Sequence, residues 1–268
     1  MFAKYARILV VAEPAPLAAE DQGPVLPRDE ARRELHYRLF ALPAALIGAH
    51  LVVSVMPGAV RMLAMWIHEC GHAVTAWLCG FPAFPGPWFT PVFPDRSRVL
   101  TVMLVGLIGF GGFRAWKKRQ WVLVVSGAAL LIVQFIFTAR LYSDQAQQLI
   151  IFGGDAGCFV LGSVLIATFY ANREGAIYQN SLRWGFLVIG ALAYMDAFAV
   201  WSHGAANIPF GENENGLSDP SVLTELYGWT IQQLLDRYYH LAIFCLVALA
   251  VVYTAGLAQA QQVWKRAN

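Results

Sequence analysis

Apolar residues along this chain gather in long runs separated by short polar segments. A helix that spans a membrane needs about 20 largely apolar residues, because lipid offers no partners for backbone hydrogen-bonding groups. Seven runs come near this length and predict membrane-spanning helices at 39–57, 60–79, 98–113, 121–139, 149–171, 183–202 and 239–258. The expected fold class is therefore all-α, a polytopic integral membrane protein built as a bundle of six or seven transmembrane helices.

The composition supports this interpretation and excludes other classes of protein. Of the 268 residues, 58% are hydrophobic and only 13% are charged, whereas a soluble domain carries about 25% charged residues. The net charge of +2 is too small for a protein that binds nucleic acid by neutralising phosphates. We therefore expect a lipid bilayer as the surroundings and no nucleic acid as a partner. The oligomeric state stays open.

Charge and proline positions predict the organisation of the chain. Residues 13–31 hold four prolines among acidic and small residues, so we expect a mobile N-terminal tail over 1–31 and a single transmembrane domain over 32–268. The positive-inside rule places the basic loop Arg114–Arg119 and the C-terminus in the cytoplasm, and the acidic connection 203–238 on the other side. The expected location is an inner or plasma membrane of the bacterial type, crossed several times.

The N-terminal side of the membrane is left open by these rules. Arg28, Arg32, Arg33 and Arg38 also favour the cytoplasm. A cytoplasmic position for these arginines agrees with the other basic loops only if one early segment does not cross the membrane. The candidates are 98–113, the shortest segment, and the proline-rich loop before it.

The second apolar run contains the motif His68-Glu69-Cys70-Gly71-His72. Four residues make about one helical turn, so His68 and His72 project from the same helix face. Two imidazoles at this spacing can bind one Zn²⁺, and Glu69 beside them can accept a proton from a metal-bound water. Ionisable residues at membrane depth are costly and usually functional, so the motif predicts a zinc site rather than histidines paired only with each other.

The residues around this motif resemble a known family. His68-Glu69-Cys70-Gly71-His72-Ala73, followed by Ala76 and Gly80, is similar to the active-site helix of the site-2 protease family of intramembrane zinc metallopeptidases. The resemblance implies a zinc metalloendopeptidase that cuts a partner's membrane segment. It also implies a third zinc ligand, an Asp from a later transmembrane helix.

Two residues are candidates for this third ligand. Asp155 lies in an apolar run with glycines on both sides, which lets another backbone approach closely, and an unpaired Asp at membrane depth needs a cation or a proton. We therefore expect zinc to be held by His68, His72 and Asp155. Asp196 is the alternative ligand, or a carboxylate that orients a ligand histidine, or a partner of Arg140 or His50.

The expected function is hydrolysis of peptide bonds in or near the membrane by a zinc-bound water, with Glu69 as the proton acceptor and a membrane protein or peptide as substrate. The alternative is a non-catalytic receptor, chaperone or transporter that retains a structural metal site. A closed site with four protein ligands, completed by Asp196 or His50, would favour this alternative, because catalysis needs an open position.

The segment that follows the motif is also unusual. Residues 81–94 hold five prolines and five aromatic residues, so a regular helix is excluded there. The segment is interpreted either as a gate or edge for an unwound substrate or as an aromatic belt at the membrane interface.

Overall fold

The computed structural model describes residues 27–171, 173, 175–213 and 216–267, and most of them are helical. The long helices are α1 (Arg28–Val55), α2 (Pro57–Leu78), α3 (Arg98–Lys117), α4 (Trp121–Arg140), α5 (Ser143–Ala167), α7 (Leu182–Ser202) and α9 (Ile231–Ala267). The shorter elements are η1 (Thr168–Tyr170), α6 (Ala176–Gln179), η2 (Ala205–Asn207), the antiparallel strands β1 (Glu212–Asn213) and β2 (Gly216–Leu217), α8 (Asp219–Ser221) and the π-helix η3 (Val222–Leu226). The predicted all-α fold class is confirmed.

Each of the seven predicted runs corresponds to one long helix, and the runs 39–57, 60–79 and 149–171 extend one to four residues beyond the helix end. Six helices among the described residues are long and apolar enough to cross a membrane, namely α1, α3, α4, α5 with η1, α7 and α9. Helix α2 is not among them, and its sequence carries Arg61 and the motif residues. Helix α1 begins at Arg28, so residues 28–31, expected in the tail, form its first turn. Residues 1–26 of that tail lie outside the described residues.

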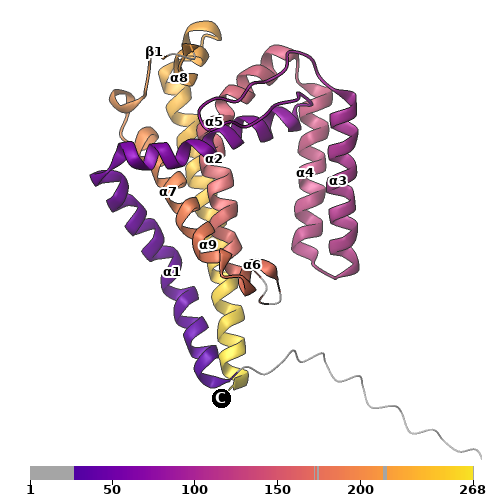
Figure 1. The fold of residues 1–268 in the computed structure, drawn as a ribbon, viewed down its shortest axis with the longest axis vertical. Helices are drawn as coiled ribbons and strands as arrows, with labels where there is room; N and C mark the ends of the chain where they lie inside the picture. The colour runs from indigo at the N-terminus through magenta and orange to yellow at the C-terminus, as the bar shows by residue number, and fades with distance from the viewer. Residues whose placement is uncertain (1–26, 172, 174, 214–215, 268) are drawn as a thin grey trace, which may run out of the picture.

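Helix α2 lies across one end of the bundle instead of running along it. In Figure 1 the other long helices run roughly along the long axis of the molecule, whereas α2 passes crosswise from the end of α1 toward α4. The suspected segment 98–113 lies within α3, which does have the length and composition of a span. The early segment that lacks these properties is therefore α2.

This arrangement brings most of the described basic residues to one end, whereas Arg61, Arg96, Arg98, Arg140 and Arg237 lie elsewhere. Figure 1 shows the start of α1, the α3–α4 connection, the α5–α7 connection with α6 and the end of α9 toward the same end. We call this the basic end; its basic residues are Arg28, Arg32, Arg33, Arg38, Arg114, Lys117, Lys118, Arg119, Arg173, Arg183, Lys265 and Arg266. Helix α2 and the 203–230 connection lie at the opposite end, the loop end. The start of α1 and the end of α9 thus lie toward the same end of the molecule as the α3–α4 connection.

Helices α2 and α5 cross at glycines. A Cβ atom on Gly71 would meet the backbone of Gly153, Gly154 and Gly157, and a Cβ atom on Gly157 would meet Gly71. Without side chains at these positions the two backbones approach closely, as small residues allow in membrane proteins. The crossing places the histidines of α2 directly beside α5.

Helices α3 and α4 form a hairpin that stands apart from the other long helices in Figure 1. Only Ala115 of α3 and Gln134 of α4 are buried. The Gln134 amide donates a hydrogen bond of 3.1 Å to the carbonyl of Thr101, so this buried polar side chain joins the two helices of the hairpin.

A buried ion cluster ties the helices together at the basic end. The Glu34 carboxylate of α1 accepts hydrogen bonds of 2.9 and 3.0 Å from Arg183 of α7 and one of 2.8 Å from Arg38. Arg38 in turn donates to the carbonyl of Gly256 in α9. These contacts join α1, α7 and α9 far from the histidine motif.

Candidate metal centre

Helix α2 holds the two motif histidines with their rings side by side. His68 and His72 are buried, and their Nε2 atoms lie 3.1 Å apart. This is the arrangement that the i, i+4 spacing predicts for one helix face. The pair therefore forms as the sequence indicated.

The partners of the Nδ1 atoms determine which ring nitrogens are free. His72 Nδ1 lies 2.7 Å from the carbonyl oxygen of Ile150, which can only accept, so this nitrogen carries the proton and donates. His68 Nδ1 lies 2.9 Å from Oδ1 of Asp155, and the carboxylate likewise accepts. In neutral rings with these tautomers, both Nε2 atoms present lone pairs, the form that binds a metal.

Asp219 supplies a third acceptor to the same point. Its Oδ2 atom lies 3.1 Å from Nε2 of His68 and 3.1 Å from Nε2 of His72. The residue begins the short helix α8, within the connection that joins α7 to α9. Three acceptor atoms thus lie at the corners of a nearly equilateral triangle.

The size of this triangle fits a zinc ion. Four ligands at about 2.0–2.1 Å in a tetrahedron lie about 3.3 Å from one another, close to the 3.1 Å edges observed here. A single proton can bridge only two of the three acceptors, whereas a cation can interact with all of them. Among the described residues, the group contains two His and one Asp and no fourth side-chain ligand, so one position of a tetrahedron stays free.

The surroundings of Asp219 favour its charged form. Burial alone would raise the pKa of this carboxyl, but His72 and His68, when their Nε2 atoms carry a proton, outweigh burial and hold the pKa below its usual range. The Asp219 side chain keeps 27% of its surface exposed, whereas His68 and His72 are buried.

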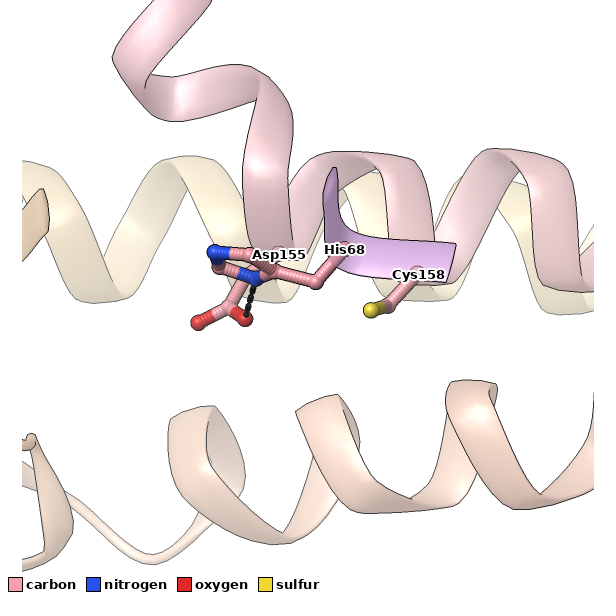
Figure 2. A group of neighbouring side chains, drawn as sticks. All are labelled: His68, Asp155 and Cys158. Carbon is pink, nitrogen blue, oxygen red and sulfur yellow. Dashed lines mark hydrogen bonds and ion pairs between the residues drawn. The ribbon is translucent and has the colours of Figure 1, made fainter. Parts of the chain in front are cut away.

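Asp155, the expected third ligand, lies on the other side of His68. Figure 2 shows its carboxylate joined to the His68 ring, the contact made at Nδ1. Its second oxygen accepts a hydrogen bond of 2.8 Å from the indole nitrogen of Trp201. Both oxygens are thus engaged with donors, and the position suits a carboxylate that orients a ligand histidine. The assignment of Asp155 as a ligand stays a prediction, which this geometry does not favour.

Cys158 gives a second possible group with His68 and Asp155, whose candidate ligand atoms lie within 4.8 Å of one another. In Figure 2 the cysteine stands beside the pair, and only His68 and Asp155 are joined. A metal at this point would have to displace the Nδ1 proton that already bonds Asp155. The triangle with Asp219 needs no such change.

Asp196 is paired with a residue that the sequence analysis did not consider for it. Arg61 of α2 contacts Oδ2 of Asp196 at 3.0 Å and Oδ1 of Asp155 at 3.5 Å. The expected partners Arg140 and His50 are both exposed. Arg61 therefore links the two carboxylates and neutralises part of their charge beside the histidines.

Glu69 is held by the segment that follows α2. Its Oε2 atom lies 2.7 Å from the hydroxyl of Thr90, and both side chains are buried. The segment folds back on itself through the bridge between Ala83 and Val92, and the indole of Trp77 donates to the carbonyl of Ala83. The proline-rich segment thus forms a hairpin, residues 81–93, that contacts the motif.

Gly154 lies directly under the metal triangle. A Cβ atom at this position would come within 2.6 Å of Nε2 of both His68 and His72. The missing side chain therefore leaves the space in which the two nitrogens converge. Glycine is required here by close approach and not by its backbone angles.

Sequence reasoning missed Asp219, which it counted only among the acidic residues of the 203–238 connection. The other acidic or histidine candidates near that loop, His203 and Glu212, are exposed. One signal was present, because Ser218-Asp219-Pro220 is typical of a helix start and marks an ordered turn in an otherwise irregular connection. Comparison with known proteins adds no assignment: no family model, curated protein or solved structure matches this chain.

Proposed function

We propose that this protein is a membrane-embedded zinc metallopeptidase, similar to the site-2 protease family, that hydrolyses peptide bonds of membrane proteins or peptides. The observation that carries the proposal is the convergence of three acceptor atoms, two Nε2 and one carboxylate oxygen, within 3.1 Å of one another. This donor set, two His and one carboxylate with an open position, is that of catalytic rather than structural zinc sites.

The ligands in this proposal are His68, His72 and Asp219. When bound, zinc would lower the pKa of a water molecule and polarise the carbonyl of the scissile bond. Asp155 accepts the Nδ1 proton of His68 and the carbonyl of Ile150 accepts that of His72, so both rings keep the tautomer that binds metal.

Glu69 is the general base in this mechanism. It accepts a proton from the water that attacks the carbonyl carbon and returns it to the amine nitrogen as the C–N bond breaks. The Thr90 hydroxyl engages one carboxylate oxygen and leaves the other for this proton transfer. Burial of Glu69 keeps competing water away from the carboxylate.

The orientation in the membrane follows from the distribution of charge. The positive-inside rule supports a cytoplasmic basic end, which carries both the start of α1 and the end of α9. The loop end, with the triangle and the 203–230 connection, then faces the outside of the cell or the periplasm. An inner or plasma membrane of the bacterial type is part of this proposal.

The experiment that tests the proposal replaces Glu69 by Gln. The amide keeps the shape of the side chain but cannot accept a proton, so zinc content should be unchanged while cleavage of a membrane-embedded test substrate falls about 10²–10⁴-fold. His68→Ala serves as the contrasting variant, because it should lose zinc as well as activity. Equal cleavage by wild type and Glu69→Gln at matched zinc content would refute the mechanism, and zinc binding without any cleavage would favour a structural metal site.

A further inference from the structure

We infer that the protease cleaves its substrates at the loop end of the membrane, within about two helical turns of the surface, and not at the bilayer centre or the basic end. This inference rests on the proposed function and specifies its substrate class, namely proteins anchored by a transmembrane helix whose non-cytoplasmic end is the cleaved segment. It follows from where the helices place the metal triangle along the membrane normal.

Helix α5 gives the first measure of depth. The apolar part of α5 with η1 begins at Leu149, about 9 Å of helix before Asp155, which is bonded to His68, and it ends at Tyr170, about 22 Å after Asp155, at about 1.5 Å per residue. The hydrocarbon core of a bilayer is about 30 Å thick. The site therefore lies well beyond the midplane, on the side away from the basic end.

Helix α7 gives an independent measure. Its length from Leu182 to Ser202 corresponds to about 30 Å, one bilayer core. Asp196, which reaches the site through Arg61, lies about 21 Å from the first of these residues and about 9 Å from the last. Both helices thus place the site roughly 9 Å below the surface at the loop end.

The third ligand and the hairpin agree with this depth. Asp219 belongs to the connection between the spans α7 and α9, and a ligand from such a connection reaches a site only near the surface. The hairpin exposes large aromatic side chains, as segments at the membrane interface do; these are Phe84, Trp88, Phe89 and Phe93. The hairpin also contacts Glu69 through Thr90, so the base lies close to the same interface.

Substrate chemistry explains why this depth matters. The backbone carbonyls inside a transmembrane helix are occupied by hydrogen bonds and are hidden from attack. The last four carbonyls of a helix have no intrahelical partner, so a substrate helix whose C-terminal end lies at the loop-end surface offers reactive peptide bonds without unwinding of the span. A site about 9 Å deep reaches these terminal turns.

The test uses the full-length protein, loaded with zinc, and three single-span substrates co-expressed with it. Each substrate has one apolar helix with a lysine cluster at its N-terminal, cytoplasmic end and one Gly-Gly pair, which loosens the helix, placed near the lysine-free C-terminal end, in the middle or near the lysine end. Mass spectrometry of the products identifies the cleaved bond. Reporter fusions at residues 118 and 215 of the protease, expected to give opposite signals, fix its own orientation.

We expect cleavage within the last two turns of the lysine-free end, at least about tenfold faster for the first substrate than for the others, and lost in Glu69→Gln. Glu69-dependent cleavage at the middle or the lysine end would overturn the inference and leave the proposed function intact. Equal signals from the two reporters would also overturn it, because the site would then not lie at the non-cytoplasmic side. Absence of cleavage in all three substrates by zinc-loaded wild type would refute the proposed function itself.

Discussion

Replacing Asp219 and Asp155 in turn by the isosteric amide Asn distinguishes a metal ligand from a residue that orients a ligand. Asp219→Asn and Asp155→Asn remove the same charge and keep the same shape. In the proposed site, Asp219 contacts both Nε2 atoms at 3.1 Å, whereas Asp155 contacts only the far nitrogen of His68. The two variants should therefore affect zinc in different ways.

The magnitude for Asp155→Asn follows from its two donors. His68 Nδ1 and Trp201 Nε1 each donate to one carboxylate oxygen, but an amide has only one oxygen, so one donor loses its partner. Loss of a partner that orients a ligand typically weakens metal binding 10–100-fold, or about 1.4–2.7 kcal/mol. Asp219→Asn removes the charged third ligand and leaves two imidazoles, so we expect a loss beyond about 100-fold, since catalytic zinc sites need three protein ligands.

The assay is competition for zinc between the purified variants and a chromophoric chelator, with Glu212→Gln as the control because this exposed acid lies in the same connection. Substitution by Co²⁺ gives a second measurement, since its visible spectrum depends on the ligands. The spectrum should change in Asp219→Asn and persist in Asp155→Asn. The reverse pattern, with the larger loss of affinity in Asp155→Asn, would restore Asp155 as the third ligand and refute our reading of the triangle.

Two further variants test the space and the base. Gly154→Ala puts a methyl group within 2.6 Å of both Nε2 atoms, so zinc affinity should fall at least about tenfold. The control Gly109→Ala should leave zinc affinity unchanged, because nothing lies within 4 Å of the added methyl group and alanine is the better helix former. Equal zinc affinity in both variants would contradict the assigned close contact. Thr90→Val removes the hydroxyl that bonds the Glu69 carboxylate, so it should lower kcat more than it raises KM. Thr90→Ser keeps a hydroxyl and should restore activity. A Thr90→Ser variant as impaired as Thr90→Val would contradict the role of the hydroxyl in positioning Glu69.

Much of the fold could be predicted from the sequence because the bilayer imposes a simple rule on length and polarity. The seven apolar runs all coincide with long helices. The rule is less informative for α2, whose apolar residues suggest a span while Arg61, His68, Glu69 and His72 lower its hydropathy. Only the arrangement in space shows that α2 lies crosswise, since direction depends on packing against α5 and not on composition.

The site could be predicted only where its residues are close in the sequence. His68 and His72 meet because helical geometry fixes their spacing. Asp155 was placed near them correctly, but its role depends on which ring nitrogen it faces, and sequence carries no such information. Asp219 could not be located because the long 203–230 connection must fold back onto α2, and this return is determined by tertiary contacts.

The crosswise position of α2 connects the topology of the chain with the chemistry of the site. An ionisable side chain at the centre of a bilayer costs about 2.5–3.5 kcal/mol or more, so a spanning helix with the charges of α2 would be unfavourable. Near the surface this cost falls, and the partners present reduce it further: Arg61 pairs with Asp196, and Glu69 bonds Thr90. A helix that does not cross also leaves six spans, an even number, which returns the end of α9 to the side where α1 begins. The polar residues of α2 that could bind a metal are therefore also those that favour a position of this helix near the membrane surface.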